Sequence, residues 1–255
     1  MAPFLESDTD MALAETPFAL THKGEWPGPT VLRRGWARAT ARPWNDHIED
    51  ASLRLVRGGS LFINACAVRL MELGASSVIS PPLPIGGRKP WMDSGFDEHI
   101  ELALLRLDLD HHVPSPDHLV VERTTESIEE LLEIDQLAFD PFWRFDIHGI
   151  TEAIQATNRS TVFLIRDSNG STIGFAIVGY GNAISYLQRV AVHPSWQGHG
   201  MGRSLVRVAA RKARLHGSQA ILLNTQFNNT PAISLYESEG YELLPERLAL
   251  MRFGE

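Results

Sequence analysis

The sequence predicts an α/β protein in which helices flank a mixed β-sheet, and three observations support this. Two β-branched apolar runs, 161–166 and 172–180, are joined by Asp167-Ser-Asn-Gly170, a combination typical of a β-hairpin. A third apolar run, 184–192, leads through closely spaced glycines into a helical pattern. Strand and helix patterns then alternate up to residue 253.

Length and composition are those of an ordinary soluble globular protein, and 255 residues suit one large or two modest domains. The net charge of −8 disfavours general nucleic-acid binding and is mildly favourable for a cationic partner such as an amine. No apolar run reaches the roughly 18 residues of a membrane span. The acidic first twenty residues fit neither a secretory nor a transit peptide, so we expect a cytoplasmic protein without membrane contact.

The single cysteine, Cys66, excludes an intrachain disulfide and any cysteine-based zinc site. It lies in a helical apolar pattern, which predicts a small buried packing residue. The cluster Asp108-Leu-Asp-His-His112 contains metal-ligating residue types, but it runs from a strand into a proline-rich connection. We therefore expect no metal site.

The first half of the chain shows fewer elements than the second. Residues 1–30 carry prolines and polar residues without periodicity, and we expect an irregular lead-in. A helix is expected at 60–73, a short strand at 75–80, and either a strand pair or one long strand at 96–109.

The connection Val113-Pro-Ser-Pro-Asp117 predicts a linker, because its prolines end the preceding strand. Beyond it, Ser127-Ile-Glu-Glu130 is a capping box, in which side chains satisfy free N–H groups at a helix N-terminus. The remaining elements expected are a strand at 118–123, helices at 127–139, 148–157, 201–216 and 230–239, and strands at 220–224 and 241–253.

The turn after the third strand of the second half, residues 197–202 and here called the glycine loop, indicates an anion site. Gly198, Gly200 and Gly202 remove Cβ atoms where the backbone turns sharply, and a helix N-terminus with free N–H groups follows. A diphosphate suits such a site. The spacing fits neither a P-loop nor the dinucleotide fingerprint, because only three residues separate Gly198 from Gly202 and Arg203 comes next.

The string Gln197-Gly-His-Gly-Met-Gly202 resembles the Q/R-x-x-G-x-G/A signature of the GCN5-related N-acetyltransferases (GNAT). A strand ending Val190-Ala-Val-His-Pro194 precedes it, as in that family, and Asn229-Thr-Pro-Ala-Ile-Ser-Leu-Tyr-Glu-Ser-Glu-Gly-Tyr241 resembles another of its segments. The resemblance covers 118–253. It implies a GNAT fold, with a mostly antiparallel sheet and one splayed parallel pair, a catalytic domain at 118–255, and acetyl-CoA as the cofactor.

The resemblance also implies roles for individual residues. The Val190 N–H would meet the thioester carbonyl, Val192 would pair with the pantetheine amides, and the glycine loop with Arg203 would receive the diphosphate. The cofactor-binding set is Val190, Ala191, Val192, Gln197, Gly198, His199, Gly200, Met201, Gly202, Arg203 and Asn229. Tyr236 would protonate the departing thiolate, a role that suits a phenol because its ordinary pKa of about 10 is near that of a thiol.

The general base is not evident, because neither carboxylate familiar from the family is present. Asn224 and Tyr186 occupy the two positions. Deprotonation would then use water held by Asn224, Gln226, Tyr186 or His193, or the amine would arrive neutral. Phe142 and Trp143 belong to an aromatic-rich stretch, 139–145, that would form the acceptor wall, although core packing explains it equally well.

The helix after the glycine loop carries Arg203, Arg207, Arg211 and Arg214 on one face. We expect Arg203 to reach an outer phosphate and the other three to face solvent.

The first half repeats part of the second at offsets of 143–146 residues. Helix 60–73 parallels 203–216, and Leu102-Ala-Leu-Leu-Arg106 parallels Leu248-Ala-Leu-Met-Arg252. The repeat lacks a glycine loop, and Trp91 stands where the second half has Tyr236. Residues 31–112 therefore indicate a degenerate GNAT-like domain, as in tandem members of the family; an unrelated α/β lobe is the alternative.

The sequence thus predicts an acetyl-CoA-dependent N-acetyltransferase that acts on a primary amine, either a protein N-terminus or a small molecule, by direct attack. The alternative is a noncatalytic acyl-CoA-binding regulatory module. A P-loop nucleotide hydrolase is the least favoured hypothesis. The acceptor and the oligomeric state are left open.

Overall fold

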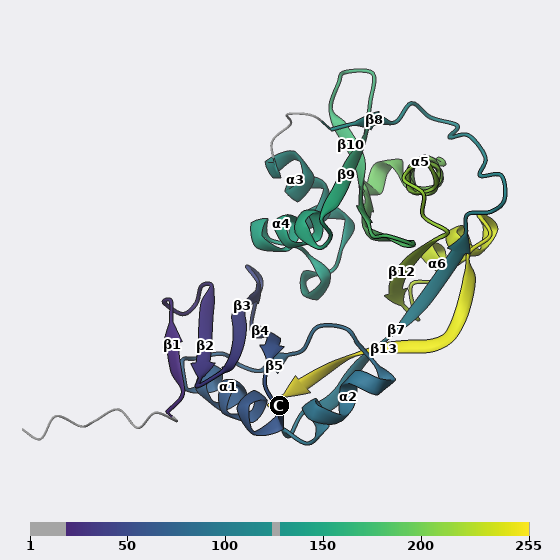
Figure 1. Cartoon of the computed structure of the whole chain (residues 1–255). Helices are drawn as coiled ribbons and strands as arrows, with labels where there is room; N and C mark the ends of the chain where they lie inside the picture. Colours follow the sequence, from purple (N-terminus) through teal and green to yellow (C-terminus); the bar gives the residue numbers. More distant parts are fainter. Residues whose placement is uncertain (1–18, 124–127, 255) are drawn as a thin grey trace, which may run out of the picture.

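The computed structural model describes residues 19–123 and 128–254. One mixed sheet runs through this part of the chain in the strand order β1-β2-β3-β4-β5-β13-β7-β12-β11-β10-β9-β8, and β6 pairs with β13 (Figure 1). The strands are β1 (Thr21–Lys23), β2 (Thr30–Arg34), β3 (Ala37–Asn45), β4 (Ile48–Arg57), β5 (Val78–Ile79), β6 (Leu83–Pro84), β7 (Asp97–Asp108), β8 (Val121–Glu122), β9 (Arg159–Arg166), β10 (Thr172–Tyr180), β11 (Ile184–Val192), β12 (Ala220–Gln226) and β13 (Glu242–Phe253).

Helices cover both faces of the sheet in the C-terminal half, here residues 113–254. Helices α3 (Ile128–Ala138) and α4 (Ile147–Gln155) pack on one face, and α5 (Met201–Leu215) packs on the other. The predicted α/β architecture with a mixed sheet is confirmed. The apolar face of α5 includes the fully buried Leu205 and Ala209, but Leu215, at its end, is 82% exposed.

The two central parallel strands of this half diverge. β11 pairs with β12 only where Ile184–Tyr186 lies beside Ala220–Leu222. The register between β10 and β11 shifts at Gln188, which forms a bulge. Bulges bend a strand and increase its twist. Beyond Tyr186, therefore, the edge of β11 that faces β12 has no strand partner among the described residues.

The N-terminal half, residues 19–112, contains strands that the sequence did not indicate. β2, β3 and β4 form an antiparallel meander, and β1 pairs with β2 inside the stretch expected to be irregular. The lead-in prediction is therefore wrong from residue 21 onward. The strand signal was hidden because the buried faces carry small residues, such as Ala37, Ala39 and Ala41 on β3, between arginines and threonines.

The last strands of the two halves are exchanged. β7 of the N-terminal half inserts beside β12 of the C-terminal half, while β13 completes the N-terminal sheet beside β5. β7 and β13 also pair with each other, with Leu102 opposite Leu248, its counterpart in the repeat. In Figure 1 both strands run between the two lobes, and the C-terminal end lies near α1 (Ser60–Glu72) and α2 (Ile85–Met92).

The connection that contains 113–117 runs along α5 and is held by its arginines. Arg207 forms an ion pair with Asp117 and donates to the carbonyl of Ser115, and Arg211 donates to that of Val113. Arg214 donates to the carbonyl of His111. The expectation that this stripe faces solvent is therefore wrong: it binds the segment that joins the halves.

Most predicted elements of the C-terminal half are found within a few residues of their expected ends. The 118–123 strand is shorter than expected, since β8 has only two residues, and Ser127 of the predicted capping box lies outside the described residues. The 96–109 stretch is a single strand, β7. Cys66 is fully buried, as predicted, and burial raises the pKa of its thiol to about 12. None of the described helices could span a membrane.

Candidate active site

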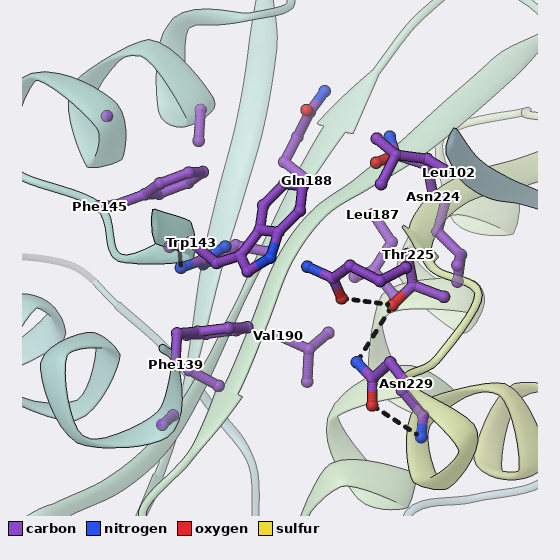
Figure 2. Close-up of a pocket in the computed structure, with 18 of the residues that line it drawn as sticks. Leu102, Phe139, Trp143, Phe145, Leu187, Gln188, Val190, Asn224, Thr225 and Asn229 are labelled. Atoms are coloured by element: carbon purple, nitrogen blue, oxygen red, sulfur yellow. Dashed lines mark hydrogen bonds between the residues drawn. The ribbon is translucent and has the colours of Figure 1, made fainter. Parts of the chain in front are cut away.

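A cavity of about 760 Å³ opens where β11 and β12 diverge. Its walls come from β11, β12, the glycine loop, α4, α6 (Thr230–Ser238) and the segment 139–145, here called the aromatic loop. Figure 2 shows Phe139, Trp143 and Phe145 on one side, facing Asn224, Thr225 and Asn229 on the other. The cavity therefore joins the two stretches that the sequence marked for cofactor and acceptor.

The glycine loop has the backbone geometry of an anion site. Gly198 and Gly200 have φ angles of +76° and +84°, a region that L side chains avoid. Among the described residues, the N–H groups of 198–203 donate to no protein acceptor. The 15-residue helix α5 begins at Met201, so its positive dipole end faces the same place. The predicted diphosphate site thus has N–H donors that no described protein group uses.

Side chains around the loop fix its shape. Gln197 donates from Nε2 to the carbonyl of Val192 over 3.0 Å, which ties the loop to the end of β11. The rings of His118 and His199 bond to the backbone carbonyls of His199 and Gln197. Arg203 lines the cavity and forms a 2.8 Å ion pair with Glu239. Because these contacts hold the backbone, the free N–H groups are preorganised.

Tyr236 lies on α6 at the cavity wall and is 9% exposed. Its ring packs on Tyr241 at 5.6 Å between centroids. Burial raises the pKa of Tyr236 to about 12, although the nearby charge of Arg189 acts in the opposite direction. The phenol is therefore protonated at neutral pH, and within the described residues its hydroxyl makes no hydrogen bond. It is free to donate to a ligand.

Asn229 combines two roles. Its Oδ1 accepts from the Ala232 N–H as the N-cap of α6, and its Nδ2 donates to the Thr225 hydroxyl over 3.1 Å (Figure 2). Both residues line the cavity, as do Asn224 and Gln226. Fixed polar groups thus lie along the β12 side of the cavity.

Not every predicted site residue contributes a side chain. Val190, Ala191 and Val192 line the cavity, but the side chain of Met201 is buried in the core and His199 is not a lining residue. For Met201 and His199, only the backbone N–H groups are available to a ligand. Tyr186 is 39% exposed and lies outside the cavity lining, as does His193. These two side chains therefore do not contribute to holding a water there.

The aromatic loop is anchored to β11 by a buried ion pair that the sequence analysis missed. Arg189 forms two hydrogen bonds with Asp135, of 2.7 and 2.8 Å, and its guanidinium lies between the rings of Phe139 and Phe145 at 3.5 and 3.8 Å. Asp135 is fully buried, and Arg189 lines the cavity. Phe142 and Trp143 line it as well, and their rings pack edge to face at 4.9 Å.

The N-terminal half supplies part of the wall, which the sequence analysis also missed. Arg42 and Trp44 of β3 and Arg54 of β4 line the cavity opposite α4. Arg42 binds Glu152 of α4 through two hydrogen bonds, of 2.9 and 3.0 Å, and Arg54 lies 3.6 Å from the same carboxylate. The alternation of alanines with longer residues along 37–42 was the available signal for a half-buried strand here.

The cavity offers few groups that titrate near neutral pH. Glu152 is the one carboxylate among the described residues that line it, and no histidine does so. Burial alone would raise the pKa of Glu152, but the hydrogen bonds and charges of Arg42 and Arg54 outweigh it and lower the pKa. Glu152 is therefore a weak base. The described residues contain no cluster that could hold a metal ion.

Comparisons with known proteins agree with this geometry. Residues 127–241 match the sequence model of the acetyltransferase (GNAT) family. A mycothiol acetyltransferase of Thermobifida fusca is 38% identical over 213 residues, which cover 82% of this chain and 61% of that protein. A mycothiol acetyltransferase of Saccharomonospora viridis is 27% identical over 208 residues, 79% and 61% of the two chains. The chain thus spans about 61% of the length of both relatives.

The whole chain also has a solved structural counterpart. A tandem GNAT protein from the clavulanic acid biosynthesis pathway superimposes with a TM-score of 0.61, covering 93% of this chain and 84% of that one. The two sequences are 16% identical, so the likeness concerns the fold.

Proposed function

This chain belongs to the GCN5-related N-acetyltransferase superfamily, and on that premise we propose that it transfers an acetyl group from acetyl-CoA to a small primary amine. One observation carries the proposal: a single cavity connects the unoccupied N–H groups of the glycine loop, the buried phenol of Tyr236 and the aromatic loop. A donor thioester and an acceptor amine would meet between them.

The cofactor-binding residues fit coenzyme A. The N–H groups of Gly198 to Arg203 would hold the diphosphate, since they are the unpaired donors at the start of α5. The free edge of β11 beyond Tyr186 would pair with the pantetheine amides. The Val190 N–H would donate to the thioester oxygen, where charge develops as the amine attacks, and a fixed dipole needs no reorganisation.

The reaction proceeds by direct attack. The amine nitrogen bonds to the acetyl carbon, the carbon–sulfur bond breaks, and its electron pair leaves on sulfur. Tyr236 donates its proton to that thiolate, which its raised pKa permits because the phenol is protonated at neutral pH. The amine loses one proton to solvent, and Tyr236 is reprotonated from solvent. No covalent enzyme intermediate is formed.

Proton removal from the amine is assigned to water or to an amine that arrives neutral. The residues that support this assignment are Asn224 and Gln226, whose polar side chains line the cavity on β12, since Tyr186 and His193 lie elsewhere. Glu152 is poorly suited to the task, because its pair of hydrogen bonds with Arg42 stabilises the carboxylate.

A small acceptor is favoured over a protein N-terminus. Arg42, Trp44 and Arg54 of the N-terminal half line the cavity, and the two arginines bind Glu152 of α4 there. Two relatives are named mycothiol acetyltransferases, so a mycothiol-type amine is the first acceptor to test. The assignment of 31–112 as a degenerate, noncatalytic domain and of 118–255 as the catalytic domain is part of this proposal, as is the cytoplasmic location.

The test measures release of free CoA thiol and formation of the acetylated product. Small amines, led by mycothiol-type compounds, are compared with short peptides that have free N-termini, and calorimetry records acetyl-CoA binding. We expect turnover with a small amine and little with peptides. Preferential turnover of peptides would overturn the acceptor class. Binding of acetyl-CoA without turnover of any amine would support the noncatalytic regulatory module, and absence of binding would refute both.

A further inference from the structure

The backbone carbonyls of the aromatic loop are all hydrogen-bonded. The carbonyl of every residue from Phe139 to Phe145 accepts a hydrogen bond. Each of these bonds restrains the backbone at its residue, although loops are commonly mobile. The conformation of the acceptor-facing segment is therefore strongly determined.

Part of this bonding comes from the C-terminal half itself. The carbonyls of Phe139 and Asp140 accept from Arg144 and Trp143 within the loop. Gln136 donates to the carbonyl of Phe145, and Arg189 donates to that of Trp143 over 2.7 Å. Three carbonyls in the middle of the loop, those of Pro141, Phe142 and Arg144, have their partners elsewhere.

Those partners belong to the N-terminal half, in the β3–β4 turn, here residues 44–48, which includes the last two residues of β3. Asn45 donates from Nδ2 to the carbonyls of Pro141 and Arg144, over 2.8 and 3.1 Å. The indole Nε1 of Trp44 donates to the carbonyl of Phe142 over 2.6 Å, and its ring stacks on that of Phe142 at 5.1 Å.

The side chain of Asn45 is buried and held in one orientation. It is 1% exposed, and its Oδ1 accepts from the N–H groups of His47 and Ile48, which orients the amide so that Nδ2 faces the loop. If this position served only to pack the two halves together, an apolar residue would suffice. Burying an amide costs free energy unless its hydrogen bonds are made. The Nδ2 group of Asn45 donates these hydrogen bonds to carbonyls of the aromatic loop.

We propose that the β3–β4 turn of the N-terminal half, through Trp44 and Asn45, is a positioning element that fixes the aromatic loop and thereby sets acceptor recognition in the C-terminal half. This inference rests on the proposed function for the identity of the acceptor wall. It gives the half that lacks a glycine loop a defined part in the reaction, which is to hold Phe142 and Trp143 where the amine must bind.

The test uses the full chain with Asn45→Ala and Trp44→Phe. Asn45→Ala leaves two loop carbonyls without donors, and Trp44→Phe keeps an aromatic ring but removes the Nε1 donor. We expect roughly a tenfold rise in the acceptor KM for Asn45→Ala and a smaller rise for Trp44→Phe, while the Kd for acetyl-CoA is unchanged. Trp36→Phe is the control, because Trp36 lies at the other end of β3 and is 68% exposed.

Hydrogen exchange supplies a readout that does not depend on activity. The N–H groups of Trp143 and Arg144 donate to the carbonyl of Asp140, and that of Phe145 donates to the carboxylate of Asp135 on α3. We expect these N–H groups to exchange faster in both variants than in the wild type and in Trp36→Phe. If both variants lower thermal stability but leave the acceptor KM and this exchange unchanged, the turn is an ordinary interface and the proposal is refuted.

Failure of the proposed function can be distinguished from failure of this positioning role. If the wild-type chain acetylates no amine, the exchange of the loop still shows whether the turn positions it. If Asn45→Ala does not fold, Trp44→Phe decides the question by the same two measurements.

Discussion

The two halves of this molecule share the order strand, strand, helix, strand, helix, strand from β3 and from β10 onward, apart from the two-residue strand β6, and they differ in the connection that leads into the first of these helices. In the C-terminal half, eight residues, 193–200, separate β11 from α5; in the N-terminal half, only Gly58 and Gly59 separate β4 from α1. The longer connection contains the glycine loop with its unoccupied N–H groups. The fold is therefore compatible with either connection, and the proposed diphosphate site depends on the longer one.

A second difference lies on the short helix that follows. Tyr236 on α6 packs on Tyr241, and at the same place in the N-terminal half Trp91 on α2 packs edge to face on Phe96 at 4.9 Å. Both aromatic pairs support the sheet, but only Tyr236 carries a hydroxyl at a cavity wall. The same packing is thus preserved in the N-terminal half without a hydroxyl at this position.

The largest expected effect separates these two aromatic residues. Tyr236→Phe keeps the ring but removes the acid, and we expect kcat to fall roughly 10²- to 10⁴-fold with the Kd for acetyl-CoA unchanged. Trp91→Phe should lower thermal stability and leave kcat unaltered. Because burial raises the pKa of Tyr236 to about 12, its deprotonation should produce no falling limb in the rate between pH 6 and 10. Wild-type turnover in Tyr236→Phe would remove it from the mechanism.

The next effect concerns buried charge in each half. Asp135 is fully buried, so Asp135→Asn leaves Arg189 without its counter-charge and should reduce the free energy of unfolding by about 3–5 kcal/mol. In the N-terminal half, Arg88 pairs with Glu98, whose side chain is 45% exposed, and Glu98→Gln should cost about 1 kcal/mol or less. Urea unfolding followed by circular dichroism measures both. Equal losses of unfolding free energy in Asp135→Asn and Glu98→Gln would contradict this ranking.

A smaller effect distinguishes the two connections. Gly200 and Gly59 are the N-caps of α5 and α1, with φ angles of +84° and −119°. Gly200→Ala places a side chain in the left-handed region at a cost of about 1–2 kcal/mol, so acetyl-CoA affinity should fall by about 5- to 30-fold. Gly59→Ala meets no atom within 4 Å and should leave that affinity unchanged. Calorimetric titration of both variants with acetyl-CoA measures this difference. If Gly200→Ala and Gly59→Ala bind acetyl-CoA with comparable affinity, the loop does not bind the cofactor.

The smallest effect tests the ion pair that joins the halves at the cavity. The pKa of Glu152 is lowered in the folded protein, so its pairing with Arg42 stabilises the fold above the unfolded value of about 4.5. That contribution is lost as the pH falls through the lower folded pKa. Glu152→Gln should therefore be less stable than the wild type by up to about 1 kcal/mol at pH 7 and approach it below pH 4.5.

Thermal unfolding of the two proteins across this pH range measures the convergence. Glu72→Gln is a suitable control, since the Arg69–Glu72 pair lies within α1 and joins no two parts of the chain. A difference between wild type and Glu152→Gln that stays constant with pH would contradict the assigned role of the ion pair.

Much of the C-terminal half could be predicted because its signals are local. The hairpin β9–β10, the strand β11 and the glycine loop are each specified by neighbouring residues, and the loop's positive φ angles require glycine wherever the rest of the chain lies. Strands β2 to β4 escaped prediction because alanine contributes little to a hydrophobic pattern, although Ala39 and Ala51 are fully buried.

The fold class, the glycine loop and the candidate acid Tyr236 could be read from the sequence, since each depends on residues close together in the chain. Only the tertiary structure decided that β7 and β13 are exchanged, that Arg189 is held by Asp135, and that Trp44 and Asn45 bond to the aromatic loop. The partners in these last two sets of contacts are separated by 54 to 99 residues. No local pattern predicts such pairings, because they form only when segments far apart in the sequence pack together and buried polar groups meet their partners.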